Sequence, residues 1–283
     1  MELNYFIKAY SNSQFKIKHF ENEIFIVKKS FSNPKNIHNA TKIKNFPDIK
    51  FNSKNIYNFK SVGFKRLLNK RKTLQAEMPF IAGLSGMDIL KFMTISEIKK
   101  LKKSFVAYIK FNLSNSKNKL ISKHIYLNII NDQLNKDFFF SKREKKKLDF
   151  IFNNIPDELS YPVGLNHGDF TLDNMIFNNN QIWLIDQIKS PIETPIQDLV
   201  KLFQDTKKLW FLRNTFGKDN IRLKLICDFI NNDDFFKLIL HKYKYEFYLT
   251  ELCSLFRIIP YLKDDLTYYW LKNEINKMIW SFK

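Results

Sequence analysis

The stretches NHGDFTLDN at positions 166–174 and IWLID at positions 182–186 decide how this chain of 283 residues is interpreted. The first stretch carries Asp169 and, five positions later, Asn174. The second stretch ends in another acidic residue, Asp186. The carboxylates of Asp169 and Asp186 and the amide of Asn174 therefore occur within one short part of the chain.

Local geometry predicts that these three side chains converge. The polar run 178–181 is typical of a tight turn, so residues 175–177 and 182–185 are expected to pair as a β-hairpin. Such a hairpin returns Asp186 to the neighbourhood of Asn174, without any assumption about distant parts of the chain.

Phosphoryl transfer from ATP needs this kind of arrangement. A hydroxyl acceptor must be oriented, and the charge of the triphosphate must be neutralised by metal ions and by a cation. Magnesium prefers hard oxygen ligands, usually one or two carboxylates together with phosphate oxygens. One loop that holds both an Asp and an Asn can supply a catalytic group and a metal ligand.

The pattern His-Gly-Asp-x-x-x-x-Asn, then Ile-Asp, then Asp198-Leu199, resembles that of the aminoglycoside phosphotransferase and choline kinase superfamily. The resemblance implies a bilobal, protein-kinase-like α+β fold and a small-molecule kinase that uses ATP and Mg²⁺. It implies that Asp169 is the catalytic residue and that Asn174 and Asp186 bind the metal. It further implies that Asp198 braces the catalytic loop and that His167 has a structural role.

Two positions favour the small-molecule branch over protein kinases. Gly168 stands where regulated protein kinases usually carry Arg. Gln187-Ile188 replaces the Phe-Gly that follows the metal-binding Asp in protein kinases.

The N-terminal part offers candidate nucleotide contacts. Phe25-Ile26-Val27-Lys28 resembles the kinase strand that ends in the phosphate-binding lysine, and Lys28 is preferred to Lys29 because it shares a strand face with Ile24 and Ile26. The run 78–83 resembles the family's hinge, so the adenine contacts are expected at Met78, Phe80 and Ile81. Pro79 lacks an N–H and cannot donate. These apolar residues are also what a plain buried strand requires.

Two features depart from the kinase pattern. The segment 11–23 has no glycine-rich phosphate loop, and the helix expected at 33–46 contains no Glu to pair with Lys28. Either that ion pair is absent or the helix is misassigned; Glu21, Glu23 and Asp48 are the nearest acids.

Simpler interpretations remain for each residue alone, because Asp169 can cap a helix and Asn174 and Asp186 can be turn residues. The alternative function is a catalytically inactive kinase-like binding protein. The formal net charge of +19 would let such a protein bind nucleic acid. The lysines are scattered, however, and an AT-rich gene explains them as well, so we do not expect a nucleic-acid partner.

The expected partner is a small molecule with a hydroxyl group: an amino-alcohol, a sugar or a surface-glycan precursor. A cationic acceptor would need carboxylates and aromatic faces. Candidates lie in the C-terminal helices, although most of these aromatic residues are equally expected in the core: Tyr243, Tyr245, Glu246, Tyr248, Glu251, Tyr268, Tyr269 and Trp270.

Composition sets the class of protein. Hydrophobic residues make up 45% of the chain and charged residues 27%, which is typical of a globular protein. No run is long and apolar enough for a transmembrane helix. With only Cys227 and Cys253 a disulfide scaffold is excluded, and a cytoplasmic location is expected. Oligomeric state cannot be read from the sequence.

The order of elements predicts a β-rich N-terminal lobe, 1–83, and a larger, mostly helical lobe, 84–283. A hairpin is expected over 14–27 and strands at 56–59 and 73–81, with a basic connection containing Arg66 and Arg71 between them. Capping boxes at Thr94 and Ser141 start two helices, with a polar loop at 114–119 between them. Further helices are expected at 195–212, 220–230, 233–259 and 264–281.

Overall fold

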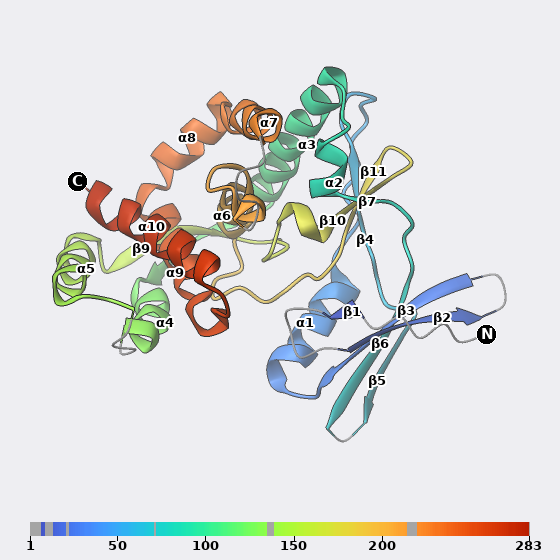
Figure 1. Ribbon diagram of the computed structural model, residues 1–283, viewed down its shortest axis with the longest axis horizontal. Helices are drawn as coiled ribbons and strands as arrows, with labels where there is room; N and C mark the ends of the chain where they lie inside the picture. The colour runs from blue at the N-terminus through green and yellow to red at the C-terminus, as the bar shows by residue number, and fades with distance from the viewer. Residues whose placement is uncertain are drawn as a thin grey trace. The chain divides into compact units, whose positions relative to one another are not determined.

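The computed structural model describes residues 7–8, 14–20, 23–70, 72–134, 139–213 and 220–282 (Figure 1). The chain divides into two compact units. Unit 1 comprises Met1–Ser104 and His167–Lys189, and unit 2 comprises Phe105–Asn166 and Ser190–Lys283. The lobe boundary near Gly83 stays a prediction. None of the described helices is long and apolar enough to span a membrane.

The first sheet of unit 1 has five strands in the order β1-β2-β3-β6-β5. Their bounds are β1 Ile7–Lys8, β2 Gln14–Phe20, β3 Glu23–Phe31, β5 Arg66–Lys70 and β6 Thr73–Pro79. The predicted hairpin is confirmed, because β2 and β3 are antiparallel with Ile17 opposite Ile26. The turn residues 21–22 lie outside the described part.

Helix α1, Pro34–Asn45, follows β3 where the sequence predicts a helix. The Asn33 side chain accepts a hydrogen bond from the backbone N–H of Asn36, and Pro34 occupies the first turn, where no N–H partner is needed. Ala40 and Ile43 are buried, so one face of α1 packs into unit 1.

The second sheet of unit 1 has the order β4-β11-β10-β7. Strands β10, Met175–Asn178, and β11, Gln181–Leu184, form the predicted hairpin. Strand β4, Asn58–Ser61, runs parallel to β11, and the short β7, Leu84–Ser85, pairs with β10. The strand expected at 56–59 therefore supports the hairpin that carries the motif residues.

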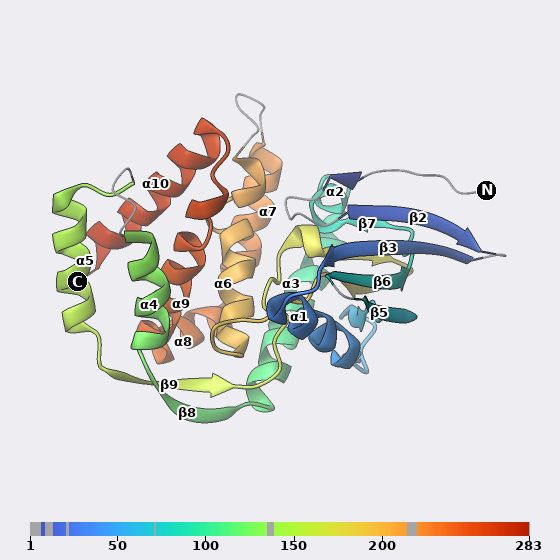
Figure 2. The same cartoon turned by 90° about the horizontal axis from the view of Figure 1, so that it is seen from below.

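Unit 2 is mainly helical. Helix α3, Ile95–Ser114, begins in unit 1 and continues into unit 2 after Ser104. Within unit 2, α9 packs against both α4 and α6, as Figure 2 shows. The remaining elements are α4 His124–Leu134, α5 Lys142–Asn154, α6 Pro195–Thr206, α7 Ile221–Asn231, α8 Asp234–Lys242, α9 Lys244–Phe256, α10 Asp265–Ser281 and the strand pair β8 Lys117–Ser122 and β9 Glu158–Val163.

Two segments predicted as connections are strands. Residues 66–70 form β5, which pairs with β6, and Arg71 lies outside the described residues. The polar loop predicted at 114–119 gives way to β8 from Lys117 onward, paired with β9. Side chains of β8 are almost all exposed, so no alternation of polar and apolar residues marks it as a strand.

Two predicted helices are shorter than expected. The helix expected at 233–259 is interrupted at Tyr243, whose backbone lies outside the helical region (φ −115°, ψ 44°), and this separates α8 from α9. The helix expected at 195–212 ends at Thr206, and Leu209 has a left-handed backbone (φ 55°) before a short 3₁₀ turn. Neither break contains Gly or Pro, so no helix-breaking residue in the sequence predicted either of them.

Candidate active site

The loop between β9 and β10 brings Asp169 and Asn174 together. The side-chain amide of Asn174 donates to the Asp169 carboxylate (2.9 Å) and to the Asp169 backbone carbonyl (2.8 Å). A 3₁₀ turn at Leu172–Asn174 sets this spacing, with the Thr171 N–H donating to the carbonyl of Asp169. Because Nδ2 is used in this way, the amide oxygen of Asn174 faces away from Asp169.

Buried aromatic residues fix the base of this loop. Phe170 is fully buried and lies against the rings of Phe59 and His167, with centroid separations of 6.0 and 6.1 Å. Nδ1 of the buried His167 accepts a hydrogen bond from the Asp169 N–H (3.2 Å). Gly168 has φ 89°, in the left-handed region that disfavours other residues. An Arg side chain at this position would strain the loop.

Burial lowers the pKa of His167 to about 4. The negative charges of Asp169 and Asp186 oppose this change, and the positive charge of Lys42 reinforces it. The neutral ring is the form that the Asp169 contact requires, because an unprotonated Nδ1 is needed to accept this hydrogen bond. A structural role for His167 agrees with this geometry.

The β10–β11 hairpin returns Asp186 to the loop as predicted. Asn179 and Asn180 have φ 45° and 62°, the two left-handed residues that a tight two-residue hairpin turn requires. The Ile185 N–H then donates to the Asn174 carbonyl (3.1 Å). Asp186 therefore follows directly on a residue that is hydrogen-bonded to the loop of Asp169 and Asn174.

Asp186 is itself held in an unusual backbone conformation, with φ 55°. The next residue, Gln187, is fully buried, and its side-chain amide donates to the Leu184 carbonyl (3.1 Å) and to Ser61 Oγ (3.3 Å). A non-glycine residue in this region costs on the order of 1 kcal/mol, so it persists only where its surroundings hold it.

Lys28 supplies a cation to the same place. Its ammonium lies 2.6 Å from Asp186 Oδ1, and both side chains are partly exposed. Lys28 therefore does form an ion pair, with Asp186 and not with a residue of the helix. The helix itself, at 34–45, was correctly predicted although it has no acidic residue. The partner of Lys28 was missed because it lies far away in sequence.

The residues present fit a magnesium ion. The carboxylate of Asp186 and the amide oxygen of Asn174 are hard donors, and the Lys28 ammonium shows that this carboxylate already attracts a cation. Within the described ranges, no group of three or more His, Cys, Asp or Glu side chains is arranged to hold a metal ion. A magnesium ion here would therefore need phosphate and water oxygens to complete its shell.

The hinge candidates differ in what they can donate. Met78 is buried in β6, opposite Ile26. The side chain of Phe80 is 41% exposed, but its N–H donates to the Ile24 carbonyl (2.9 Å). The N–H of Ile81 has no acceptor among the residues that the structure describes. Of the two N–H groups, the one of Phe80 is therefore already used inside the sheet, and an adenine contact at Ile81 stays a prediction.

Asp198 lies in the first turn of α6 and is fully buried. The hydroxyl of Tyr108 donates to its carboxylate (2.9 Å). Its role as a brace of the catalytic loop stays a prediction.

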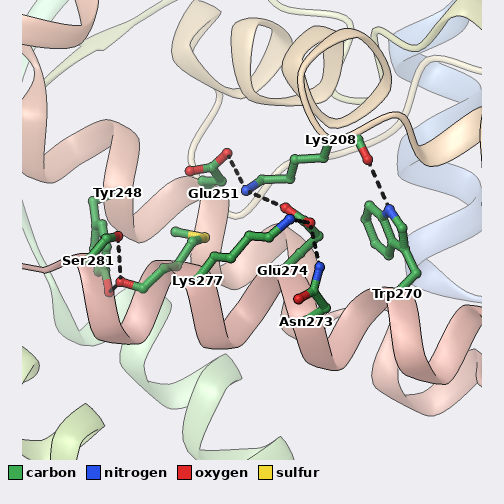
Figure 3. A network of polar contacts seen from close by, with 9 residues as sticks. Lys208, Tyr248, Glu251, Trp270, Asn273, Glu274, Lys277 and Ser281 are labelled. Atoms are coloured by element: carbon green, nitrogen blue, oxygen red, sulfur yellow. Dashed lines mark hydrogen bonds and ion pairs between the residues drawn. The ribbon is translucent and has the colours of Figure 1, made fainter. Parts of the chain in front are cut away.

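The carboxylates that the sequence offered for a cationic acceptor have internal partners. Glu246 is buried, which raises its pKa, and it accepts from the Ser160 N–H (3.0 Å). Glu251 lies 3.3 Å from the ammonium of Lys208, which also contacts Glu274 (3.4 Å), as Figure 3 shows.

The aromatic candidates in the C-terminal helices are mainly packing residues. The indole N–H of Trp270 donates to the Lys208 carbonyl (2.9 Å), and the hydroxyl of Tyr248 donates to the Met278 carbonyl (3.3 Å). Tyr243 is buried, whereas the Tyr269 ring is 69% exposed. Tyr268 packs edge-on against Phe139.

Sequence reasoning missed the residues that hold the segment after Asp186. Besides Gln187, these are Asn39 and Lys42 of α1, which bond to the backbone of Lys189 and Ile188. The only signal was the polar character of Gln187 in an otherwise apolar run. Nothing in the sequence distinguished Asn39 or Lys42 from other polar residues of the helix.

No protein-family description and no curated protein sequence matches the chain. Solved structures do. A thermostable mutant of aminoglycoside phosphotransferase APH(4)-Ia, in complex with AMP-PNP and hygromycin B, is similar at TM-score 0.59 and 11% identity, over 98% of this chain and 93% of that one. Spectinomycin phosphotransferase APH(9)-Ia, in complex with ADP and spectinomycin, gives 0.51 and 13%, over 98% and 92%.

A putative fructosamine-3-kinase from Haemophilus somnus gives a TM-score of 0.52 at 9% identity, over 97% of this chain and 90% of that one. At such low identity these likenesses concern the fold. They confirm the fold class that the motif residues indicated: this chain has the kinase-like α+β fold of the aminoglycoside phosphotransferases.

Proposed function

We propose that this chain is an ATP- and Mg²⁺-dependent phosphotransferase that acts on a hydroxyl group of a small molecule. One observation carries the proposal. In unit 1 the Asn174 amide bonds to the Asp169 carboxylate and the Lys28 ammonium lies beside Asp186. This arrangement supports the assignment of Asp169 as the catalytic carboxylate, Asn174 and Asp186 as metal ligands and Lys28 as the cation.

Asp169 is proposed as the catalytic residue. This residue is half-buried, its carboxylate is oriented by the Asn174 amide, and we assign it to the acceptor hydroxyl. The transition state of phosphoryl transfer is loose, so Asp169 would chiefly orient the hydroxyl and accept its proton late. The neutral ring of His167 accepts a hydrogen bond from the Asp169 N–H and so supports the backbone of Asp169.

Asp186 and Asn174 are proposed to hold the metal, which supplies charge neutralisation to the phosphates when bound. Lys28 lies on the same face of β3 as Ile26, so its ammonium is placed to contact phosphate oxygens as well as Asp186. Ile26, Met78, Phe80 and Ile81 would line the adenine, with the Ile81 N–H as hydrogen-bond donor.

The acceptor is proposed to be an amino-alcohol, a sugar or a surface-glycan precursor. Hygromycin B and spectinomycin are bound in two of the similar structures, and the third is named as a fructosamine kinase. Since Glu246 and Glu251 already have partners inside unit 2, we favour an acceptor recognised through its hydroxyl groups over a polycation held by these two carboxylates. The two buried free thiols fit a cytoplasmic setting.

The test is ATP turnover and phosphorylation of an amino-alcohol and sugar panel, with and without magnesium. Asp186→Ala should reduce turnover to background, and Asp169→Asn should reduce it by about 100-fold or more. The control is Asp149→Asn, which removes an exposed carboxylate of α5 and should leave turnover within about twofold.

Normal turnover in a folded Asp186→Ala protein would overturn the metal assignment. No magnesium-dependent binding of ATP to the wild-type protein would overturn the enzyme itself. Salt-sensitive retention of such an inactive protein on DNA or RNA would then identify the nucleic-acid-binding alternative.

A further inference from the structure

Helix α1 is attached to the backbone that follows Asp186. The ammonium of Lys42 donates to the Ile188 carbonyl (2.7 Å), and the side-chain oxygen of Asn39 accepts from the Lys189 N–H (2.8 Å). Asn39 and Lys42 are three positions apart and therefore lie on one face of the helix. One helix face thus contacts two consecutive residues of the segment.

This segment has no regular structure of its own. Residues 185–190 belong to no helix or strand, so their backbone groups need other partners. Ile185 donates to the Asn174 carbonyl and Ile188 donates to the His167 carbonyl (3.0 Å). The Ile188 carbonyl and the Lys189 N–H are bonded by α1, which therefore fixes the end of the segment away from the hairpin.

The conformation of Asp186 makes this attachment significant. Its left-handed backbone (φ 55°) costs free energy that neighbouring contacts must offset. On the hairpin side, Gln187 bonds to the Leu184 carbonyl. On the other side, the α1 contacts begin two residues after Asp186. The carboxylate is therefore presented by a short strained segment with attachments at both ends.

The composition of α1 points the same way. Its sequence, PKNIHNATKIKN, has no acidic residue that could pair with Lys28, and Lys28 pairs directly with Asp186. The contacts of α1 described above are with the main chain beside the proposed metal ligand. The charge of Lys42 also reaches the loop, where it helps to lower the pKa of His167.

We propose that Lys42 and Asn39 are positioning residues, through which α1 holds Asp186 in the conformation that binds the metal–nucleotide complex. This proposal rests on the proposed function, since it assigns Asp186 to the metal. It predicts that loss of the α1 contacts weakens metal-dependent binding of nucleotide and leaves metal-free binding through Lys28 and the hinge unchanged.

The experiment measures binding of a fluorescent ATP analogue at increasing Mg²⁺, and again with no metal. Lys42→Met should raise the half-saturating Mg²⁺ concentration by about 10- to 100-fold, the usual effect of losing a residue that orients a metal ligand. Lys42→Arg keeps a donor for the Ile188 carbonyl and should recover most of the loss. The control is Lys44→Met, because Lys44 lies on the same helix, is exposed and bonds to no residue that the structure describes.

Asn39→Ala provides a second variant with a readout independent of nucleotide. Hydrogen exchange at the Lys189 amide should become faster by about tenfold or more, because its acceptor is removed. A half-saturating Mg²⁺ concentration for Lys42→Met equal to that of Lys44→Met would overturn the positioning role alone. Absence of any metal-dependent nucleotide binding in the wild-type protein would overturn the proposed function, and the positioning role with it.

Discussion

Acid should weaken unit 1 through His167. The ordinary His pKa is 6.5, and burial lowers it to about 4 in the folded chain. Between these values the unfolded chain binds more protons, so the stability that His167 contributes is complete above pH 6.5 and is lost as pH falls toward 4. One pKa unit corresponds to about 1.4 kcal/mol, so this loss amounts to about 3 kcal/mol.

The main structural cause is the burial of the His167 ring, and the Asp169 N–H, which donates to Nδ1, also needs the neutral ring as its acceptor. A protonated ring would place two N–H groups against each other and a charge in a buried site. The charges of Asp169 and Asp186 favour the protonated ring and that of Lys42 disfavours it, so all three residues influence the pKa of His167. His167→Gln keeps an acceptor oxygen, cannot titrate, and isolates the contribution of the imidazole.

The assay is urea unfolding at intervals from pH 7.5 to pH 4, followed by hydrogen exchange of the peptide 167–189, which reports on unit 1 alone. The stability of wild type relative to His167→Gln should fall by about 3 kcal/mol between pH 7 and pH 4. The absolute stability of the variant is not needed. Parallel pH curves for the two proteins would refute the reasoning.

Three further predictions concern stability. Lys208→Met leaves two largely buried carboxylates without their shared cation and should lower the free energy of unfolding by about 3–5 kcal/mol, measured with urea. Lys277→Met removes a mostly exposed partner of Glu274 and should lower it by no more than about 1 kcal/mol. Equal losses of stability in the two variants would contradict the buried network. Ser141→Ala removes the capping box of α5 and should cost about 1 kcal/mol, seen as a lower Tm, and an unchanged Tm would contradict it. Gly168→Ala forces a side chain into φ 89° and should destabilise the protein by about 1–2 kcal/mol, whereas an ordinary surface Gly→Ala change would stabilise it.

Local signals predicted the centre of the candidate site well. The Asn-rich turn at 178–181 and its flanking apolar runs were sufficient for the β10–β11 hairpin, because the turn chemistry and the side-chain alternation agree. The cap residues Asn33 and Ser141 predicted two helix starts for the same reason. Each of these features is decided by residues within a few positions of one another.

Features that depend on distant residues were missed. Lys28 and Asp186 are 158 positions apart, and no periodicity in the sequence connects them. The same holds for Lys42 and Ile188, which are 146 positions apart. Strand β8 was missed for a different reason, since its exposed side chains carry no pattern and only main-chain pairing with β9 defines it.

The candidate nucleotide-site residues and the candidate acceptor residues belong to different units, which has a consequence for substrate specificity. Lys28, Asp169, Asn174 and Asp186 all belong to unit 1, whereas every acceptor candidate in the C-terminal helices, from Tyr243 onward, belongs to unit 2. The contacts described above for the proposed phosphate and metal groups, Asn174 with Asp169 and Lys28 with Asp186, are made between residues of unit 1. Substitutions in the C-terminal helices that keep unit 2 folded should change KM for the acceptor and leave the magnesium dependence of nucleotide binding unaltered, because the two properties are set by separately packed groups of residues.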